Sequence, residues 1–123
     1  FVAVAVAGGA TVVLVTQPIQ IRDAFAEADQ AYLARWIIGL DPKVVPAQLE
    51  RFNTVVRERT TVGPALLADV AREVAWKESD FGDPMHFSAD GSARMASFMA
   101  DVIESVLAEA GGAEGGSPRV AGE

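Results

Sequence analysis

Five acidic or imidazole side chains share one stretch of irregular sequence between residues 78 and 92: Glu78, Asp80, Asp83, His86 and Asp90. Carboxylate oxygens in this number could bind calcium or magnesium, and an aspartate beside an imidazole could carry out acid–base chemistry. Their spacing matches none of the calcium-loop, HExxH or zinc patterns, in which regular spacing lets the ligands converge on one ion. The pattern therefore favours an acidic, solvated loop, in which Asp80, Asp83, His86 and Asp90 are the candidate metal ligands.

His86 stands between Met85 and Phe87 and is predicted to make a packing or polar contact, not to act as a catalyst. The other common catalytic signatures are missing. The chain has no cysteine, no GxSxG, no phosphate-binding loop and no GxGxxG, and the triplet Asp80-Phe81-Gly82 lacks the other kinase motifs. No cofactor is expected, and a metal-dependent enzyme that uses residues 78–92 ranks third among the functions considered.

A second set of residues could line a ligand groove or simply form core: Trp36, Trp76, Met95, Phe98 and Met99. Their helical spacing favours core. Four of them, Trp36, Met95, Phe98 and Met99, are also the candidates for contact with protein partners.

Four amphipathic helices are expected to position these residues. Apolar stripes predict helices over residues 19–38 and 45–59, a third after the Val62-Gly63-Pro64 turn that runs through Leu66, Leu67, Val70 and Val74, and a fourth over about 95–110 with Ser88 or Asp90 as its cap. The short connections between the first three predict antiparallel neighbours. Residues 19–110 thus form the predicted helical domain, and the glycine-rich residues 111–123 are predicted to be a flexible tail.

Charge is distributed unevenly along the 123 residues. Ten basic against seventeen acidic side chains give a net charge of −7, yet residues 1–21 contain no ionisable side chain. Residues 78–123 hold two basic and nine acidic side chains, so they account for the whole imbalance. Because phosphate binding requires clustered Lys and Arg, nucleic acid is excluded as an expected partner.

Residues 1–18 are predicted to be a separate region, which consists of the apolar stretch over residues 1–16 and the Gln17-Pro18 pair that ends it. Two interpretations of this region are open. One is part of a membrane-anchoring helix, since a span needs roughly 20 such residues. The other is a buried pair of strands joined at Gly8-Gly9, because the flanking residues alternate or are β-branched.

Residues 27–81 carry the pattern Ala28, Asp29, Tyr32 and Leu33, then Leu49 and Phe52, then the Ala/Glu-rich stretch from Leu66 to Ala75. This order resembles the start of the periplasmic part of conjugation assembly proteins of the TraE kind, in which a membrane anchor precedes three helices. In that family a twisted antiparallel sheet follows, whereas this chain continues into a loop, a helix and a glycine-rich end. The resemblance implies a structural subunit of a cell-envelope secretion or conjugation assembly.

The sequence as a whole predicts a mainly α protein with four helices behind an apolar N-terminal segment, the alternative being a small α+β fold. The expected function is non-catalytic: a scaffold subunit that contacts other protein subunits, associates with a membrane through residues 1–16 and resides at the cell envelope. The alternative is a soluble α+β ligand-binding or regulatory module in the cytoplasm.

Overall fold

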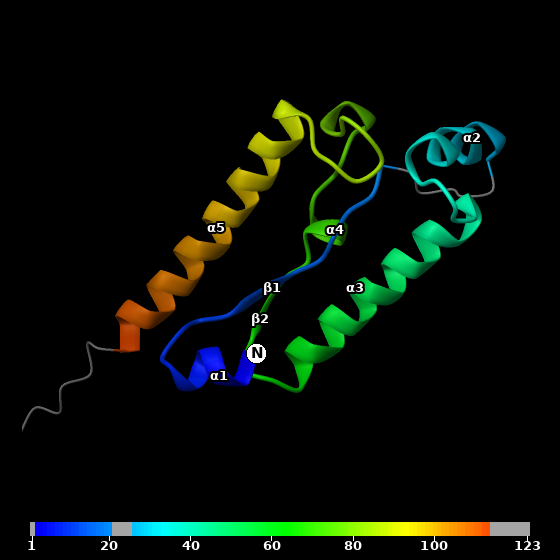
Figure 1. Cartoon of the computed structure of the whole chain (residues 1–123). Helices are drawn as coiled ribbons and strands as arrows, with labels where there is room; N and C mark the ends of the chain where they lie inside the picture. The colour runs from blue at the N-terminus through cyan, green and yellow to red at the C-terminus, as the bar shows by residue number, and fades with distance from the viewer. Residues whose placement is uncertain (1, 21–25, 114–123) are drawn as a thin grey trace, which may run out of the picture.

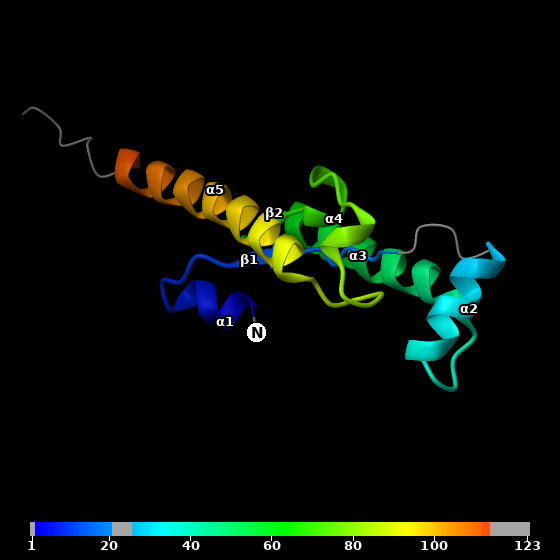
Figure 2. The same cartoon turned by 90° about the horizontal axis from the view of Figure 1, so that it is seen from above.

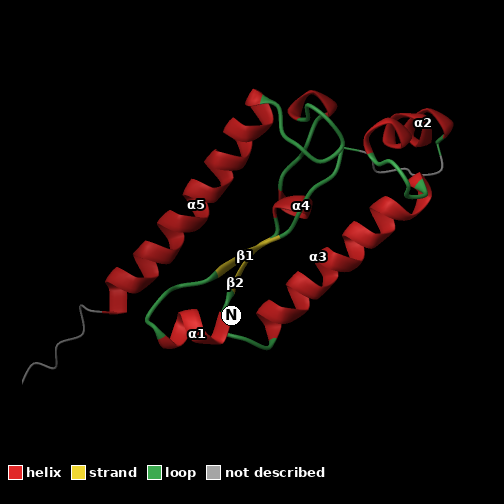
Figure 3. Ribbon diagram, viewed as in Figure 1, coloured by secondary structure: helices red, strands yellow, loops and turns green. Residues whose placement is uncertain are grey.

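The computed structural model describes residues 2–20 and 26–113. Within them the chain is mainly helical and contains one small sheet (Figures 1 and 3). The mainly α class is therefore confirmed, together with a small β component. In chain order the elements are α1 (Val2–Ala7), β1 (Val13–Val15), α2 (Glu27–Trp36), the 3-10 helix η1 (Pro42–Val44), α3 (Val45–Thr61), β2 (Leu66–Ala68), α4 (Val70–Glu73), the 3-10 helix η2 (Glu78–Asp80) and α5 (Ala89–Ala113).

The sheet consists of β1 and β2, which pair in parallel with Val13 opposite Leu66 and Val15 opposite Ala68. Parallel strands cannot be joined by a tight turn, so the chain must cross over between them. Here α2 and α3 lie in that crossover, and α3 contacts both strands. The unit is thus strand, helices and parallel strand.

Neither interpretation of residues 1–16 holds in full. The first half forms the short helix α1, and only the second half, rich in β-branched valine, forms a strand. The predicted hairpin is wrong because β1 pairs in parallel with a distant strand instead of with residues 2–7. Among the residues that the structure describes, none of the helices is both long enough and apolar enough to cross a membrane.

Two of the four predicted helices are confirmed with small shifts of their ends. The helix over 45–59 is α3, with Pro46 in its first turn, and the last helix is α5, which begins earlier and ends at Ala113. The helix over 19–38 is present only as Glu27–Trp36, and residues 21–25 lie outside the described residues, as do residues 114–123 of the predicted tail.

The third predicted helix is wrong. Leu66–Ala68 is a strand, and the chain forms only one helical turn, at α4, before it becomes extended again at Val74. The apolar spacing there fits a helix, but backbone pairing with β1 overrides that local preference. The count of four helices therefore does not hold.

The core is small and unusually polar. Among the residues whose burial the structure describes, the buried hydrophobic side chains are Leu33, Ala65, Ala68, Val70, Val74 and Phe81, and the buried polar or charged ones are Thr16, Asn53, Asp69 and Asp80. Buried polar groups must be hydrogen-bonded to be tolerated. The fold therefore depends on specific polar cross-links as much as on apolar burial.

The long helices α3 and α5 stand on either side of the strands in Figure 1. In both Figure 1 and Figure 2, α2 and the free end of α5 lie at opposite ends of the molecule. The first turns of α5 contact η2, whereas its later apolar side chains Ile103 and Leu107 are 51% and 64% exposed.

Candidate active site

The loop between η2 and α5 is closed by its own backbone. Phe81 and Phe87 form an antiparallel bridge, and the amide of Gly82 donates a hydrogen bond of 2.9 Å to the carbonyl of His86. Both phenylalanine rings pack on Trp76, and the Phe87 ring stacks on the indole at 4.8 Å. The loop over residues 81–87 is therefore a compact turn on an aromatic base.

Asp80 and Gly91 fasten this loop to the start of α5. The buried Asp80 carboxylate accepts a 2.8 Å bond from the Lys77 amide and lies 3.0 Å from Nε of Arg94. A Cβ added at Gly91 would overlap the Asp80 carbonyl, so only glycine permits this approach. Ser88 caps α5, because its hydroxyl accepts a hydrogen bond from the Gly91 amide.

Asp83 and His86 form a hydrogen-bonded pair at the tip of the loop. Nδ1 of His86 lies 2.7 Å from Oδ2 and 2.9 Å from Oδ1 of Asp83. Oδ1 also accepts 2.9 Å bonds from the amides of Met85 and His86, so the turn itself orients the carboxylate. The Asp83 side chain is 20% exposed and the His86 side chain 82% exposed.

The electrostatics of the pair fix the position of the imidazole proton. The Met85 amide holds the pKa of the Asp83 carboxyl below its usual range; desolvation opposes this, and the His86 side chain adds to the lowering. An ionised carboxylate can only accept hydrogen bonds, so Nδ1 must be the donor. In the neutral ring Nε2 then carries the lone pair, on a side chain that is largely exposed.

The loop lies at the carboxyl end of the parallel strands. Just beyond β1, the Gln17 side chain donates to the Met85 carbonyl at 3.4 Å, and the Gln20 amide donates to the Pro84 carbonyl at 3.2 Å. In open parallel sheets this is the end at which ligands bind. Beside His86, a cleft of about 100 Å³ is walled by Trp36 and Ile37 of the α2 end and by Met85.

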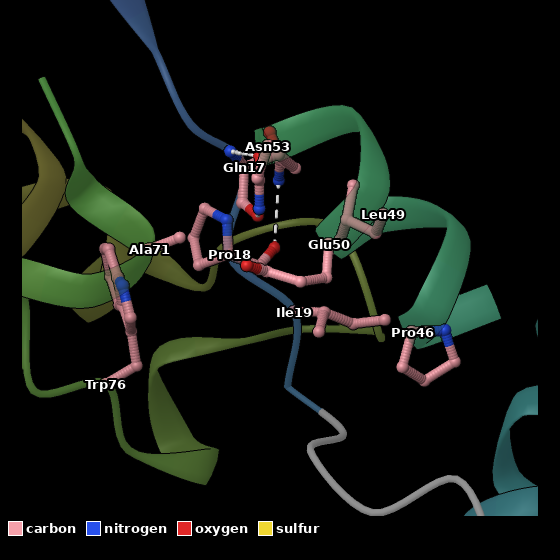
Figure 4. Close-up of a pocket in the computed structure, with 9 residues that line it drawn as sticks. All are labelled: Gln17, Pro18, Ile19, Pro46, Leu49, Glu50, Asn53, Ala71 and Trp76. Carbon is pink, nitrogen blue, oxygen red and sulfur yellow. Dashed lines mark hydrogen bonds between the residues drawn. The ribbon is translucent and has the colours of Figure 1, made fainter. Parts of the chain in front are cut away.

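A larger cavity of about 270 Å³ separates the segment after β1 from α3 (Figure 4). At one end of it the Asn53 amide bonds both backbone groups of Gln17, each at 2.8 Å. Glu50, on the same wall, already pairs with Arg57 and Arg72. These polar groups are already bonded within the protein and are not available to a ligand. The cavity is therefore a poorer candidate for a reactive site than the Asp83–His86 pair.

The structure separates the four candidate metal ligands. Asp83 and His86 meet, but Asp80 is buried against Arg94, and Asp90 is exposed in the first turn of α5. In the described part of the chain, no three His, Asp or Glu side chains gather closely enough to hold a metal ion. The arrangement is a single hydrogen-bonded pair of Asp83 and His86 and not a cage of carboxylates.

The four candidate contact residues do not form one surface. Trp36 is 55% exposed on α2, with its ring edge against Tyr32 at 6.5 Å. Met95, Phe98 and Met99 are half-buried on α5, which Figures 1 and 2 place away from α2. Contact with protein partners through these residues stays a prediction.

Sequence reasoning missed the polar cross-links behind the site. Asp69 accepts from the Thr16 hydroxyl at 2.8 Å and from two nitrogens of Arg57 at 2.6 and 2.9 Å. Asp69 directly follows β2, Thr16 directly follows β1 and Arg57 lies in α3, and nothing in their spacing indicates that they meet. An Asp three residues before a His in a glycine- and proline-rich loop, by contrast, is a local signal that could have singled out Asp83 and His86.

Comparison of this chain with protein-family models, with curated proteins and with solved structures finds no match.

Proposed function

We propose that Asp83 and His86 are the acid–base pair of a hydrolytic or acyl-transfer site. The observation that carries the proposal is the Asp83 carboxylate on Nδ1 of a largely exposed imidazole. A carboxylate in that position selects the tautomer that accepts a proton at Nε2 and stabilises the imidazolium that forms. The exposed side chain has room to meet a substrate.

The chemistry follows from that tautomer. As the oxygen of a water or hydroxyl nucleophile bonds to an acyl carbon, Nε2 of His86 takes its proton, and Nε2 then returns the proton to the leaving group. Among the described residues no side-chain hydroxyl bonds to His86, so the nucleophile is water or a hydroxyl from outside them.

The test uses the fact that the chain has a single histidine. Hydrolysis of p-nitrophenyl acetate should fall about 100-fold in His86→Ala, the contribution typical of a positioned base. Asp83→Asn should fall between that variant and the parent, because the imidazole remains but loses its fixed tautomer. Asp90→Asn, an exposed acid nearby, is the matched control and should match the parent.

A tautomer measurement separates catalysis from folding. Nitrogen-15 NMR of His86 above pH 8 should show the proton on Nδ1 in the parent protein and a mixture of tautomers in Asp83→Asn. An unchanged hydrolysis rate in His86→Ala, or a proton on Nε2 in the parent, would rule the proposal out.

The second candidate function is the structural role expected from the sequence, in which the chain contacts partners or a membrane surface. Exposed apolar side chains favour it, among them Val4 of α1 at 77% and Ile38 at 90%. If residues 1–16 bind a membrane, the chain should float with zwitterionic phosphatidylcholine vesicles, which do not repel its net charge of −7, and Val4→Asp should not. A parent chain that stays with the soluble fraction would contradict the membrane contact.

A further inference from the structure

The edges of the sheet point to an interaction that is separate from the Asp83–His86 pair. Leu66 donates to the Val12 carbonyl at 2.8 Å, and Thr16 donates to the Ala68 carbonyl at 3.1 Å. Backbone groups of a strand alternate in direction, so the even-numbered residues of β1 face β2 and Val13 and Val15 face the opposite edge. Since this sheet has two strands in the described part of the chain, no further strand meets that edge there.

The two outer edges differ in how well they resist pairing. Natural edge strands are guarded by charge, proline or bulges, because their unpaired amides and carbonyls recruit another strand. On the β2 side, Pro64 lies two residues before the strand. The segment 11–16 contains neither proline nor charge, and four of its six residues are valine or leucine. The β1 edge is therefore the unguarded one.

The kind of occupant follows from the edge and from the size of the sheet. Alternating amides and carbonyls are matched by an extended backbone and not by a helix. Parallel strands are normally buried within larger sheets, yet this sheet has two strands in the described part of the chain. With no charge over residues 1–20, an uncharged apolar strand is the complementary partner.

We propose that the Val13–Val15 edge of β1 binds a third strand, parallel to β1, made of uncharged β-branched residues and supplied by polypeptide outside residues 1–123. The added strand places β1 at the centre of a three-stranded parallel sheet. It makes main-chain bonds to Val13 and Val15 and leaves the β1–β2 register unchanged.

The probe is a synthetic peptide with the core Thr-Val-Ile-Val-Thr between pairs of lysines. Hydrogen exchange followed by NMR should show the amides of Val13 and Val15 slowed about tenfold or more at saturating peptide, since paired amides exchange only on opening. Leu67, on the opposite edge, should not change. A peptide with proline at its central position and the same lysines is the control for non-specific attraction to the acidic chain.

Nitroxide labels on the peptide show whether the bound peptide runs parallel or antiparallel to β1. In a parallel complex a label at the peptide's amino end broadens the signal of Thr11 and a label at its carboxyl end broadens that of Gln17. The reverse pattern shows antiparallel pairing and overturns the proposal.

Matched variants locate the edge. Val15→Pro removes an outward amide while Leu14 and Thr16 keep their bonds to β2, so it should abolish peptide protection. Leu67→Pro removes the equivalent amide on the other edge and should leave the protection intact. Peptides N-methylated on one edge or the other repeat the test without changing the protein, so loss of folding in a variant does not decide the result.

Three further outcomes overturn the proposal: no protection by the peptide, protection of Leu67 in place of Val13 and Val15, or protection of Val13 and Val15 that grows with protein concentration when no peptide is present. The last shows that a second copy of the chain occupies the edge, and sedimentation would report the dimer. None of these outcomes bears on the hydrolysis test of His86.

Discussion

Two carboxylates of this chain each hold a basic side chain, in opposite surroundings. Asp69 and Arg57 have side chains only 10% and 13% exposed, and Thr16 adds a third hydrogen bond to the two that Arg57 donates to the carboxylate. Asp83 engages its histidine on one nitrogen, and that side chain is 82% exposed. The same kind of pair therefore stands in two settings: burial makes the first a structural cross-link, and exposure of His86 in the second is what the proposed proton transfer requires.

The largest effect is expected at the buried pair. Asp69→Ala leaves Arg57 and Thr16 without their shared acceptor, and removing one partner of a buried pair should lower the free energy of unfolding by about 3 kcal/mol. Urea denaturation followed by circular dichroism measures it. Glu50→Ala removes a half-exposed partner of Arg57 and should cost less than about 1 kcal/mol. Equal losses of unfolding free energy in Asp69→Ala and Glu50→Ala would show that burial does not strengthen the contribution of the ion pair.

An uncharged cross-link in the same region should rank second. Asn53→Leu leaves the amide and carbonyl of Gln17 without their partners, at a cost of about 2 kcal/mol. Arg51→Ala, two residues earlier on an exposed position of α3, is the control and should change little. A loss at Asn53 no larger than at Arg51 would show that this contact does not hold β1 to α3.

Acid should weaken both pairs. The hydrogen bond from Arg57 holds the pKa of Asp69 below its usual value, and the Met85 amide does the same for the pKa of Asp83. A carboxyl whose pKa is lower in the folded state stabilises the fold fully above its unfolded pKa, about 3.9, and loses that contribution as pH falls through the folded value. Unfolding free energies measured from pH 6 down to pH 2 should decrease below about pH 4, and less steeply in Asp69→Asn. If the free energy of unfolding decreased equally in the parent and in Asp69→Asn, groups other than Asp69 would cause the acid sensitivity.

The smallest effect on stability is expected at the exposed pair. In Asp83→Asn the amide oxygen still accepts from the backbone of Met85 and His86, so the urea midpoint should stay within experimental error of the parent. His86→Ala should behave alike. A clear shift of the midpoint in either variant would make the pair structural and would weaken its assignment as a proton-transfer site.

Local patterns predicted what depends on one segment alone. The stripes of α3 and α5 and the Ser88 cap are properties of continuous sequence, and the acidic loop that contains Asp83 and His86 was recognisable from composition. The sequence also indicated an aspartate–histidine pair as one possible chemistry of this loop, but it favoured a solvated loop and did not single out Asp83 as the partner of His86.

Long-range pairing decided the rest. The apolar pattern of Leu66-Leu67-Ala68 predicts a helix, but these residues pair with β1. Asp80 is a candidate metal ligand by sequence, but in the structure it forms an ion pair with Arg94. The close approach at Gly91 likewise depends on where η2 comes to rest. Each of these follows from contacts between separate segments, which periodicity within one segment does not encode.

Thr16 and Asp69 lie 53 residues apart in the chain, and their contact has a consequence for folding speed. α3 is a local structure that can form within about a microsecond. Pairing of β1 with β2, in contrast, requires closure of the loop between them, which costs conformational entropy. Folding rates fall as contacts become more distant in sequence, so strand pairing is the slow step. Until the strands pair, the uncharged segment 11–16 is exposed without β2. We expect the net negative charge of residues 78–123 to oppose aggregation of partly folded chains through electrostatic repulsion.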